Sequence, residues 1–223
     1  MQPTFIPWAG YIELISKTDM FVFLDDVEYS HQSWQNRNYL SISGNKWLSS
    51  VAVKNPKKSQ LLLDVKLNCI DFQKKKLIKT FRQAYSRSDY KDWAIELINE
   101  YFSKNDRSLS DRNANLIKDI CRFLSIKTTF LFSSDLSSFG KKAQYVSNLL
   151  KEVKATTYVS AMGSQKYIED YGSQHFPCQI EYFNYEKSNK LPKHKDGTNW
   201  SIVHHILTNS ISRDYFGKNY DSG

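Results

Sequence analysis

The stretch MQPTFIPWAGY, residues 1–11, decides the fold of this 223-residue chain. Pro3 and Pro7 fix φ and remove two backbone donors, so this segment is neither a helix nor a central strand. Gly10 permits close backbone approach at the point where a helix would begin. A rigid aromatic loop before a helix N-terminus is where open α/β sheets bind ligands. The stretch therefore predicts one wall of a ligand crevice.

The residues after this loop predict a βαβ-like opening. Residues 11–17 have helical periodicity, with Tyr11, Leu14 and Ile15 on one face. Residues 20–24 form a continuous apolar run, which is typical of a parallel strand covered on both faces. Almost no strand precedes the loop, so we expect that the start of the chain cuts the first strand short.

The rest of the chain predicts an α/β protein with a Rossmann-like three-layer sheet and one domain over residues 1–223. A helical segment spans about 72–124, and a small β-hairpin is inserted before it. The expected elements are a hairpin over 39–42 and 46–53, helices over 72–85, 90–102, 109–124, 143–153 and 200–207 and one from 166, and strands over 61–67, 127–133, 156–160 and 179–184. We expect the tail from residue 217 to be disordered.

The bulk composition restricts the class of protein. The net charge is +8, but the lysines are scattered and no nucleic-acid-binding motif surrounds them, so we expect no nucleic-acid partner. The three cysteines have no metal-ligand spacing and are typical of a reducing compartment, which favours a cytoplasmic protein without a metal site. No apolar run is long enough to span a bilayer, so we expect no membrane insertion.

Several residues are candidates for chemistry near the opening. Asp25 and Asp26 follow the apolar strand and could act as a general base; adjacent residues point to opposite faces of a strand, so we expect at most one to face the crevice. His194 in a polar loop is a further candidate base. A recognition cluster is expected at Trp34, Asn36, Arg37 and Asn38, because Arg holds phosphate or carboxylate in a planar fork.

A second polar cluster follows the strand at 156–160. It comprises Tyr158, Ser160, Gly163, Lys166 and Tyr167. In a doubly wound sheet this edge would face the same crevice as the opening loop. Ser160 lacks the Gly-x-Ser-x-Gly context of a hydrolase nucleophile, so we expect a binding role.

Taken together, the opening loop, the strand ending in Asp25-Asp26-Val27 and the Trp34 to Asn38 cluster resemble the WbqC-like protein family. The resemblance continues at residues 133–136, 158–163 and 200–202 and covers essentially the whole chain. It implies a role in bacterial surface polysaccharide biosynthesis, notably O-antigen, and substrate-binding roles for the loop residues Gln2, Pro3, Trp8, Gly10 and Tyr11. Relatives would carry an acidic residue where this chain has Val203-His204-His205.

The opening loop is also similar to that of nucleotidyltransferases and pantothenate synthetase. Those proteins bind triphosphate through His-x-Gly-His, whereas Trp8-Ala9-Gly10-Tyr11 has neither histidine. The leading hypothesis is therefore an enzyme that transfers an acyl or aminoacyl group to an activated amino-sugar. Its partner would be a nucleotide-sugar or a carrier-bound acyl group, and the sequence identifies no cofactor. The alternatives are a nucleotide-dependent ligase and a non-catalytic scaffold of a polysaccharide enzyme complex.

Overall fold

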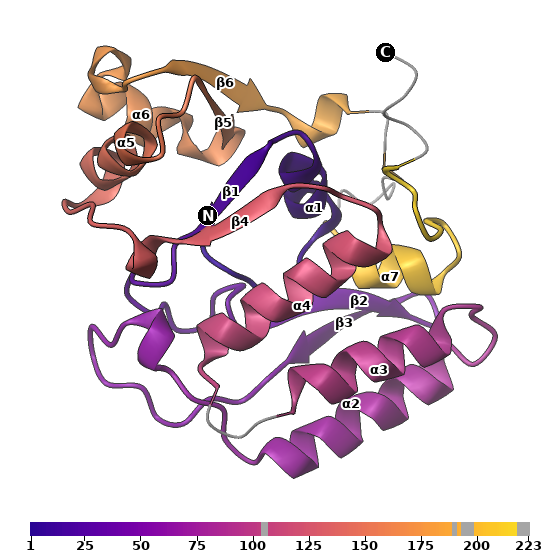
Figure 1. The fold of residues 1–223 in the computed structure, drawn as a ribbon. Helices are drawn as coiled ribbons and strands as arrows, with labels where there is room; N and C mark the ends of the chain where they lie inside the picture. Colours follow the sequence, from indigo (N-terminus) through magenta and orange to yellow (C-terminus); the bar gives the residue numbers. More distant parts are fainter. Residues whose placement is uncertain (104–106, 189–190, 193–198, 218–223) are drawn as a thin grey trace.

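The computed structural model describes residues 1–103, 107–188, 191–192 and 199–217. The chain folds into a mixed α/β protein in which helices pack around short strands (Figure 1). The principal elements are α1 (Ala9–Ser16), β1 (Met20–Phe23), β2 (Arg37–Ile42), β3 (Asn45–Ser50), α2 (Ile70–Ala84), α3 (Lys91–Tyr101), α4 (Leu109–Phe123), β4 (Thr129–Phe132), α5 (Lys142–Glu152), β5 (Thr157–Ala161), α6 (Gln165–Tyr171), β6 (Gln179–Phe183) and α7 (Ile202–Leu207). The α/β class and the helical middle segment are confirmed.

Within the described ranges the strands pair two by two rather than in one continuous sheet. β1 pairs in parallel with β4, and β5 in parallel with β6. β2 and β3 form the expected antiparallel hairpin, with Ser43 and Gly44 at positive φ in its turn. The Rossmann-like three-layer sheet is therefore not confirmed. Each parallel pair nevertheless has a carboxyl end that leads into loops. The expectation that a ligand crevice lies at such an end does not require one continuous sheet.

The strand expected over residues 61–67 is wrong. Residues Leu62–Asp64 form a short 3-10 helix instead. Leu62 and Val65 are fully buried and three residues apart, which is the spacing of a helical turn rather than the alternation of a strand. Leu61 makes an isolated β-bridge to Glu28, and Leu67 makes one to Val53, so residues 61–67 belong to no β-ladder.

Helix α1 lies inside the protein rather than on its surface. The expectation of one apolar face is too narrow, because every residue from Ala9 to Ile15 is buried. A helix that is covered all round is a core element, and α1 contacts α7 on one side. Burial of α1 fixes the opening loop that leads into it.

Helix α3 packs against both α2 and α4; α2 and α3 lie at the bottom of the protein in Figure 1, and α4 lies above them. α4 begins with a capping box, in which Ser108 Oγ accepts from the Asp111 amide and the Asp111 carboxylate accepts from the Ser108 amide. Its inward face contributes much of the main core, which runs from Phe5 to Phe216 along the sequence. A smaller apolar cluster lies under α5 and α6. The single domain over 1–223 stays a prediction.

Met1 lies beside the end of β1. Its amino group donates to Val22 O at 2.8 Å, and the Leu24 amide donates to Met1 O at 2.9 Å, which is the pattern of a parallel strand pair. Burial of the amino group lowers its pKa to about 5. No helix of the described residues is long and apolar enough to cross a membrane. The tail expected to be disordered falls, beyond Gly217, outside the described residues.

Candidate functional site

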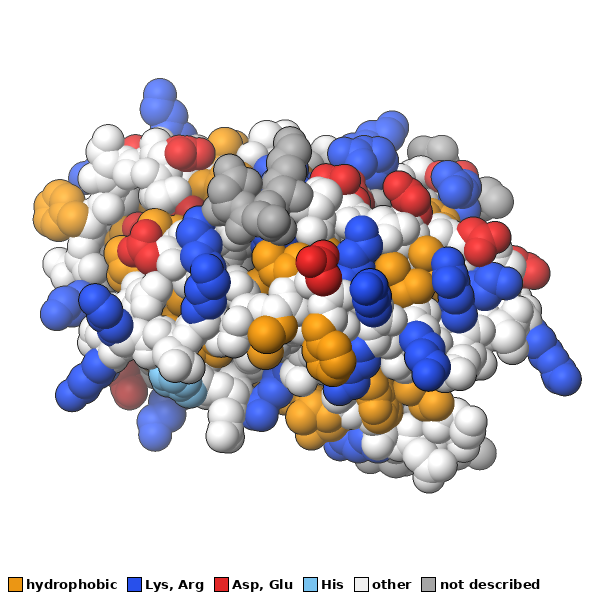
Figure 2. All heavy atoms as spheres, turned by 90° about the horizontal axis from the view of Figure 1, so that it is seen from below, with side chains coloured by type: hydrophobic (Ala, Val, Ile, Leu, Met, Phe, Trp, Pro, Cys, Tyr) orange, Lys and Arg blue, Asp and Glu red, His pale blue; other side chains and the backbone are white. Residues whose placement is uncertain are grey.

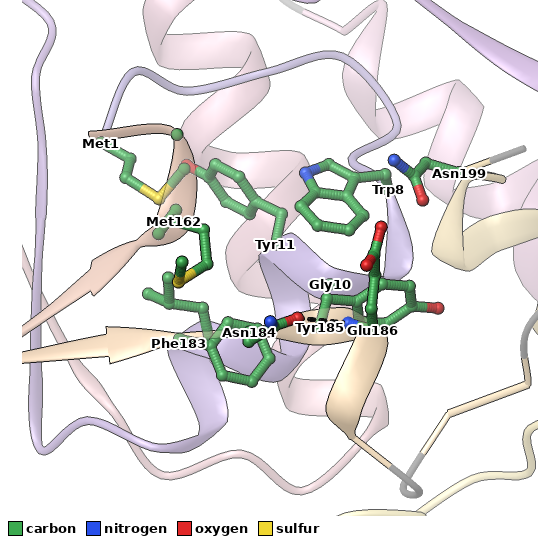
Figure 3. A pocket seen from close by; sticks show the side chains of 13 residues that line it. Met1, Trp8, Gly10, Tyr11, Met162, Phe183, Asn184, Tyr185, Glu186 and Asn199 are labelled. Carbon is green, nitrogen blue, oxygen red and sulfur yellow. Dashed lines mark hydrogen bonds between the residues drawn. The ribbon is translucent and has the colours of Figure 1, made fainter. Parts of the chain in front are cut away.

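A pocket of about 360 Å³ opens where α1 begins and where β5 and β6 end (Figure 3). The residues that line it are Met1, Trp8, Gly10, Tyr11, Leu14, Ala161, Met162, Gly163, Phe183, Asn184, Tyr185, Glu186 and Asn199. Its walls are mainly aromatic and sulfur-containing side chains, and its polar groups come from Asn184, Glu186 and Asn199. Aromatic walls with a few polar groups are the usual form of a small-molecule site.

Trp8 and Tyr185 form one wall of this pocket. Their rings meet edge to face, with centroids 4.9 Å apart. Both rings lie over Gly10, where an added Cβ would come within 2.8 Å of Tyr185 Cδ2 and closer still to the Trp8 indole. Gly10 is therefore required because two aromatic rings occupy the space that a side chain would need.

The opening loop is held by polar side chains that donate to its backbone carbonyl groups and to the Gln2 side chain. Tyr11 Oη donates to Gln2 O at 3.0 Å, and Asn113 Nδ2 donates to Pro3 O at 3.1 Å. Gln35 Nε2 donates to the Gln2 side chain at 2.9 Å. An irregular loop with prolines has backbone carbonyl groups that no β-ladder or helix satisfies, and these side chains supply the missing hydrogen-bond donors. Gln2 and Pro3 thus position the loop, whereas Trp8, Gly10 and Tyr11 line the pocket.

Asn38 belongs to the same supporting network and not to the pocket. Its Nδ2 donates to Ile6 O at 2.9 Å, and its Oδ1 accepts from the Tyr39 amide. Ile6 has φ of 35°, a left-handed conformation that is costly for a β-branched residue. The buried Asn38 side chain helps to hold that conformation, so its expected role in substrate recognition stays a prediction without support from this geometry.

Asp25 and Asp26 converge on the turn that follows β4. Asp25 is buried and accepts from the Ser134 amide at 3.0 Å and from Ser134 Oγ at 2.6 Å. Ser133 Oγ lies 3.1 Å from Asp25 Oδ1 and 2.5 Å from Asp26 Oδ1, and its single proton serves one carboxylate at a time. The expectation that the two carboxylates point to opposite faces is wrong, because β1 ends at Phe23 and strand alternation no longer applies.

Tyr145 from α5 completes this carboxylate cluster. Its hydroxyl donates to Asp26 Oδ2 at 2.5 Å, and burial together with that bond raises the Tyr145 pKa to about 12. The cluster joins the ends of β1 and β4 to α5, and neither aspartate lines the pocket. The general-base role of Asp25 and Asp26 stays a prediction, and His194 lies outside the described residues.

Trp34, Asn36 and Arg37 lie on and beside the β2–β3 hairpin, away from the pocket lining. Trp34 is exposed and its ring meets Tyr39, with centroids 5.6 Å apart. Asn36 Nδ2 donates to Val51 O at 3.0 Å, which joins the residue before β2 to the residue after β3. The structure therefore separates this cluster from the residues that enclose the pocket.

Of the second predicted cluster, Gly163 lines the pocket. Ser160 is buried and donates to Ser164 Oγ at 2.8 Å, and burial raises the pKa of its neighbour Tyr158. Tyr167 packs against the small apolar cluster, and Lys166 is exposed. The binding roles of these four side chains stay predictions.

The β6 side of the pocket was not predicted from the sequence. Phe183, Asn184, Tyr185 and Glu186 line it, and all of them lie at or just after the end of β6. The available signal was the carboxyl end of the strand expected over 179–184, since ligands gather at such ends in parallel pairs.

Glu13 lies behind the pocket wall on α1 and is fully buried. Ser188 Oγ donates to Glu13 Oε1, whereas Glu13 Oε2 is buried and has no hydrogen-bond partner among the described residues. Burial, and then the charge of Glu13, raise the pKa of Tyr185 to about 12, which places the carboxylate close to that ring. A buried carboxylate with an unsatisfied oxygen destabilises the fold.

Glu13→Gln is expected to raise the free energy of unfolding by about 1–2 kcal/mol. The substitution removes the buried charge at nearly constant volume and keeps the oxygen that accepts from Ser188. It places a neutral amide nitrogen where Oε2 lies, and an unpaired neutral amide costs less free energy than an unpaired buried charge. Urea denaturation measures the change. The exposed Glu96 on α3 gives the matched control, and Glu96→Gln should stay within about 0.5 kcal/mol of the parent. A loss of stability in Glu13→Gln alone would show that the protein compensates this charge.

The fold and pocket define a mixed α/β protein with a pocket at the carboxyl ends of a parallel strand pair. The chain belongs to the WbqC-like protein family, whose model matches residues 2–211. It is similar to a Mycobacterium tuberculosis protein described as "Uncharacterized protein Rv1507c", with 26% identity over 190 residues, which cover 83% of this chain and 81% of that protein. No solved structure matches the chain.

Proposed function

We propose that the protein is an enzyme of bacterial surface polysaccharide biosynthesis that transfers an acyl or aminoacyl group to an activated amino-sugar. The pathway comes from the association of WbqC-like proteins with O-antigen gene clusters, and membership of that family supports it. The pocket is the single observation that carries the chemical part of the proposal. The expected localisation for such an enzyme, whose substrates are activated in the cell interior, is the cytoplasm.

The size and lining of the pocket fit one sugar ring. A volume of about 360 Å³ is at the small end of the range for ligand sites. Trp8, Tyr185 and Phe183 offer ring surfaces for the apolar face of a sugar. Asn184 and Asn199 supply amide donors and acceptors for hydroxyl groups, and Glu186 supplies a carboxylate for an amine.

In the reaction an acceptor amine that has lost its proton attacks the acyl carbon, so that a C–N bond forms, the bond between the acyl carbon and its carrier breaks, and the carrier leaves. A carboxylate beside the amine can take that proton as a general base. Glu186 lines the pocket and is better placed for this task than Asp25 or Asp26, which bind the turn after β4. We therefore assign the base to Glu186 and a positioning role for the strand ends to the two aspartates.

A thermal-shift screen of the parent protein tests the proposal. A nucleotide-linked amino-sugar at about 100 times its Kd should stabilise the fold by about 2.7 kcal/mol, which is about 5–10 °C in melting temperature. Trp8→Ala should remove most of this shift because it removes one aromatic wall. Phe72→Ala, which truncates an exposed aromatic side chain on α2 outside the pocket, is the matched control and should retain the shift.

Other results of the same screen would contradict the proposal. A shift with ATP alone would favour a nucleotide-dependent ligase, although Trp8 and Tyr11 stand where the phosphate-binding histidines of such enzymes would be. No shift with any sugar, nucleotide or acyl donor, combined with stable capture of a polysaccharide enzyme, would favour a scaffold.

A further inference from the structure

We propose that the outer face of the β2–β3 hairpin is a second binding surface, which takes an anionic polysaccharide chain. This hairpin face consists of Trp34, Arg37, Tyr39, Lys46 and Leu48. None of these residues lines the pocket, so this proposal stands or fails independently of the proposed reaction.

The register of the hairpin places these side chains on one side. Tyr39 pairs with Leu48, and Arg37 lies two residues before Tyr39 on the same strand. Side chains alternate between the two faces of a strand, so Arg37 and Tyr39 share a face while Asn38 and Leu40 point into the protein. Burial agrees with this assignment, because Asn38 and Leu40 are buried whereas Leu48 is 41% exposed.

The apolar part of the hairpin face is not covered by the described part of the chain. Trp34 is 50% exposed, and its indole meets the Tyr39 ring at an interplanar angle of 64°. Exposed aromatic and aliphatic side chains that lie together mark binding surfaces more often than single exposed residues do. Trp34 is thus a flat platform held from one side by Tyr39.

The cations of the hairpin face make no ion pair with any described residue. Lys46 Nζ lies 4.1 Å from the centroid of the Tyr39 ring. Arg37 is half-buried, and its guanidinium makes no hydrogen bond to the described part of the chain. Its charge opposes the rise that burial causes in the pKa of Tyr29. A half-buried guanidinium with its donors unused is suited to a carboxylate or phosphate of a ligand.

The charge of the protein favours an anionic occupant. The net charge is +8, and Figure 2 shows Lys and Arg side chains spread around hydrophobic side chains on the face seen from below. Such a field attracts polyanions over distances longer than one contact. Charge complementarity therefore favours an acidic ligand that contacts the exposed Trp34 ring together with Arg37 and Lys46.

The geometry favours an acidic sugar chain over a nucleic acid strand. Single strands are held by aromatic rings on which successive bases stack. Here the Tyr39 and Trp34 rings are not parallel and Lys46 lies over the Tyr39 ring, which leaves one flat platform instead of a series. One ring face beside two cations matches one sugar ring that bears an acidic group.

Titration of the full chain with a tetragalacturonate oligosaccharide tests this inference. We expect binding that weakens with salt, and much weaker binding of the methyl-esterified oligosaccharide, which has the same rings without the charges. Arg37→Gln and Trp34→Ala should each reduce the affinity by about tenfold. Arg87→Gln, which removes an exposed arginine elsewhere, should change the affinity by less than about twofold.

The outcomes separate the inference from the proposed function. Arg37→Gln should leave the thermal shift by pocket ligands unchanged, since Arg37 does not line the pocket. Equal binding of the charged and esterified oligosaccharides, or unchanged affinity in Arg37→Gln, would overturn the inference. Tighter binding of an eight-residue deoxythymidine strand through the same two residues would instead identify a nucleic-acid surface.

Discussion

Asn113→Ala is expected to lower the free energy of unfolding by about 3–5 kcal/mol and the melting temperature by about 10 °C or more. Asn113 is fully buried on α4 and makes three hydrogen bonds. Its Nδ2 donates to Pro3 O at 3.1 Å and to Gln35 O at 2.6 Å, and its Oδ1 accepts from Tyr101 Oη at 3.1 Å. Truncation leaves all three partners buried without a bond, and each costs free energy.

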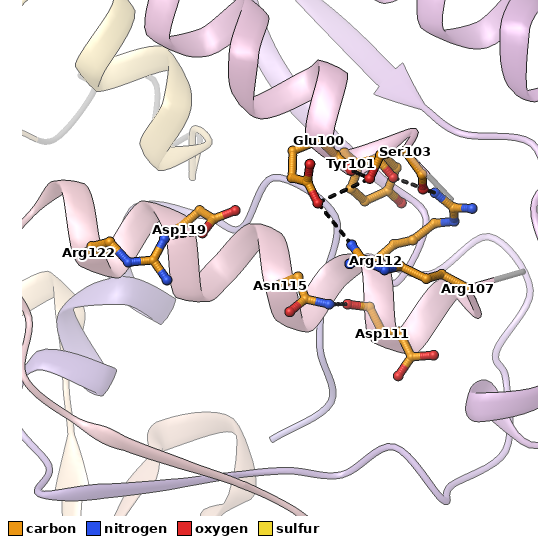
Figure 4. Close-up of polar contacts among 9 residues, drawn as sticks. All are labelled: Glu100, Tyr101, Ser103, Arg107, Asp111, Arg112, Asn115, Asp119 and Arg122. Atoms are coloured by element: carbon orange, nitrogen blue, oxygen red, sulfur yellow. Dashed lines mark hydrogen bonds and ion pairs between the residues drawn. The ribbon is translucent and has the colours of Figure 1, made fainter. Parts of the chain in front are cut away.

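The same helix supplies the control for this prediction. Asn115 lies two residues further along and donates to Asp111 O, within the helix itself (Figure 4). Asn115→Ala should change stability by less than about 0.5 kcal/mol, and Ala has the higher helix propensity. Chemical denaturation of the two variants measures the difference. Equal effects would mean that the opening loop does not depend on Asn113.

Gly10→Ala is expected to lower the affinity for the pocket ligand by at least about tenfold, or 1.4 kcal/mol. The new methyl group would overlap the Trp8 indole and come within 2.8 Å of Tyr185 Cδ2. Trp8 is half-buried and can swing outward, so the wall opens while α1 gains the helix propensity of Ala. Loss of near-ultraviolet circular dichroism from the Trp8–Tyr185 pair should report the change without any ligand.

Gly163→Ala is the matched control for Gly10→Ala. Gly163 also lines the pocket, but an added Cβ there would meet no atom within 4 Å. We expect the near-ultraviolet spectrum and the ligand affinity of this variant to stay close to those of the parent. An unchanged spectrum in Gly10→Ala as well would show that the two rings adapt to the methyl group and that the glycine is not required.

Local patterns in the sequence predicted most helices. The apolar spacing over 109–124 and the Ser108 cap determine α4, since both act within one or two turns. The turn at Ser43 and Gly44 likewise determines the hairpin. The strand prediction for residues 61–67 was wrong because a run of leucines fits a strand and a buried turn equally well. Only the segments that pack against these residues decide between the two.

Pairing between strands could not be predicted from the same patterns. β1 pairs with β4, more than a hundred residues further along the chain, while no ladder joins either strand to β5 or β6. The directions of Asp25 and Asp26 depend on Ser133 and Ser134 at the end of that distant strand. Such contacts depend on long-range packing, which no local periodicity encodes.

The sequence by itself determined the family, the α/β class and the presence of a rigid aromatic loop at residues 1–11. Proline, glycine and apolar periodicity act on their own neighbourhood, so these conclusions need no partner segment. Only the tertiary structure decided that Trp8 and Gly10 meet Tyr185, and that Arg37 lies on a separate face. Both depend on segments that are distant in sequence and brought together by burial of their apolar side chains.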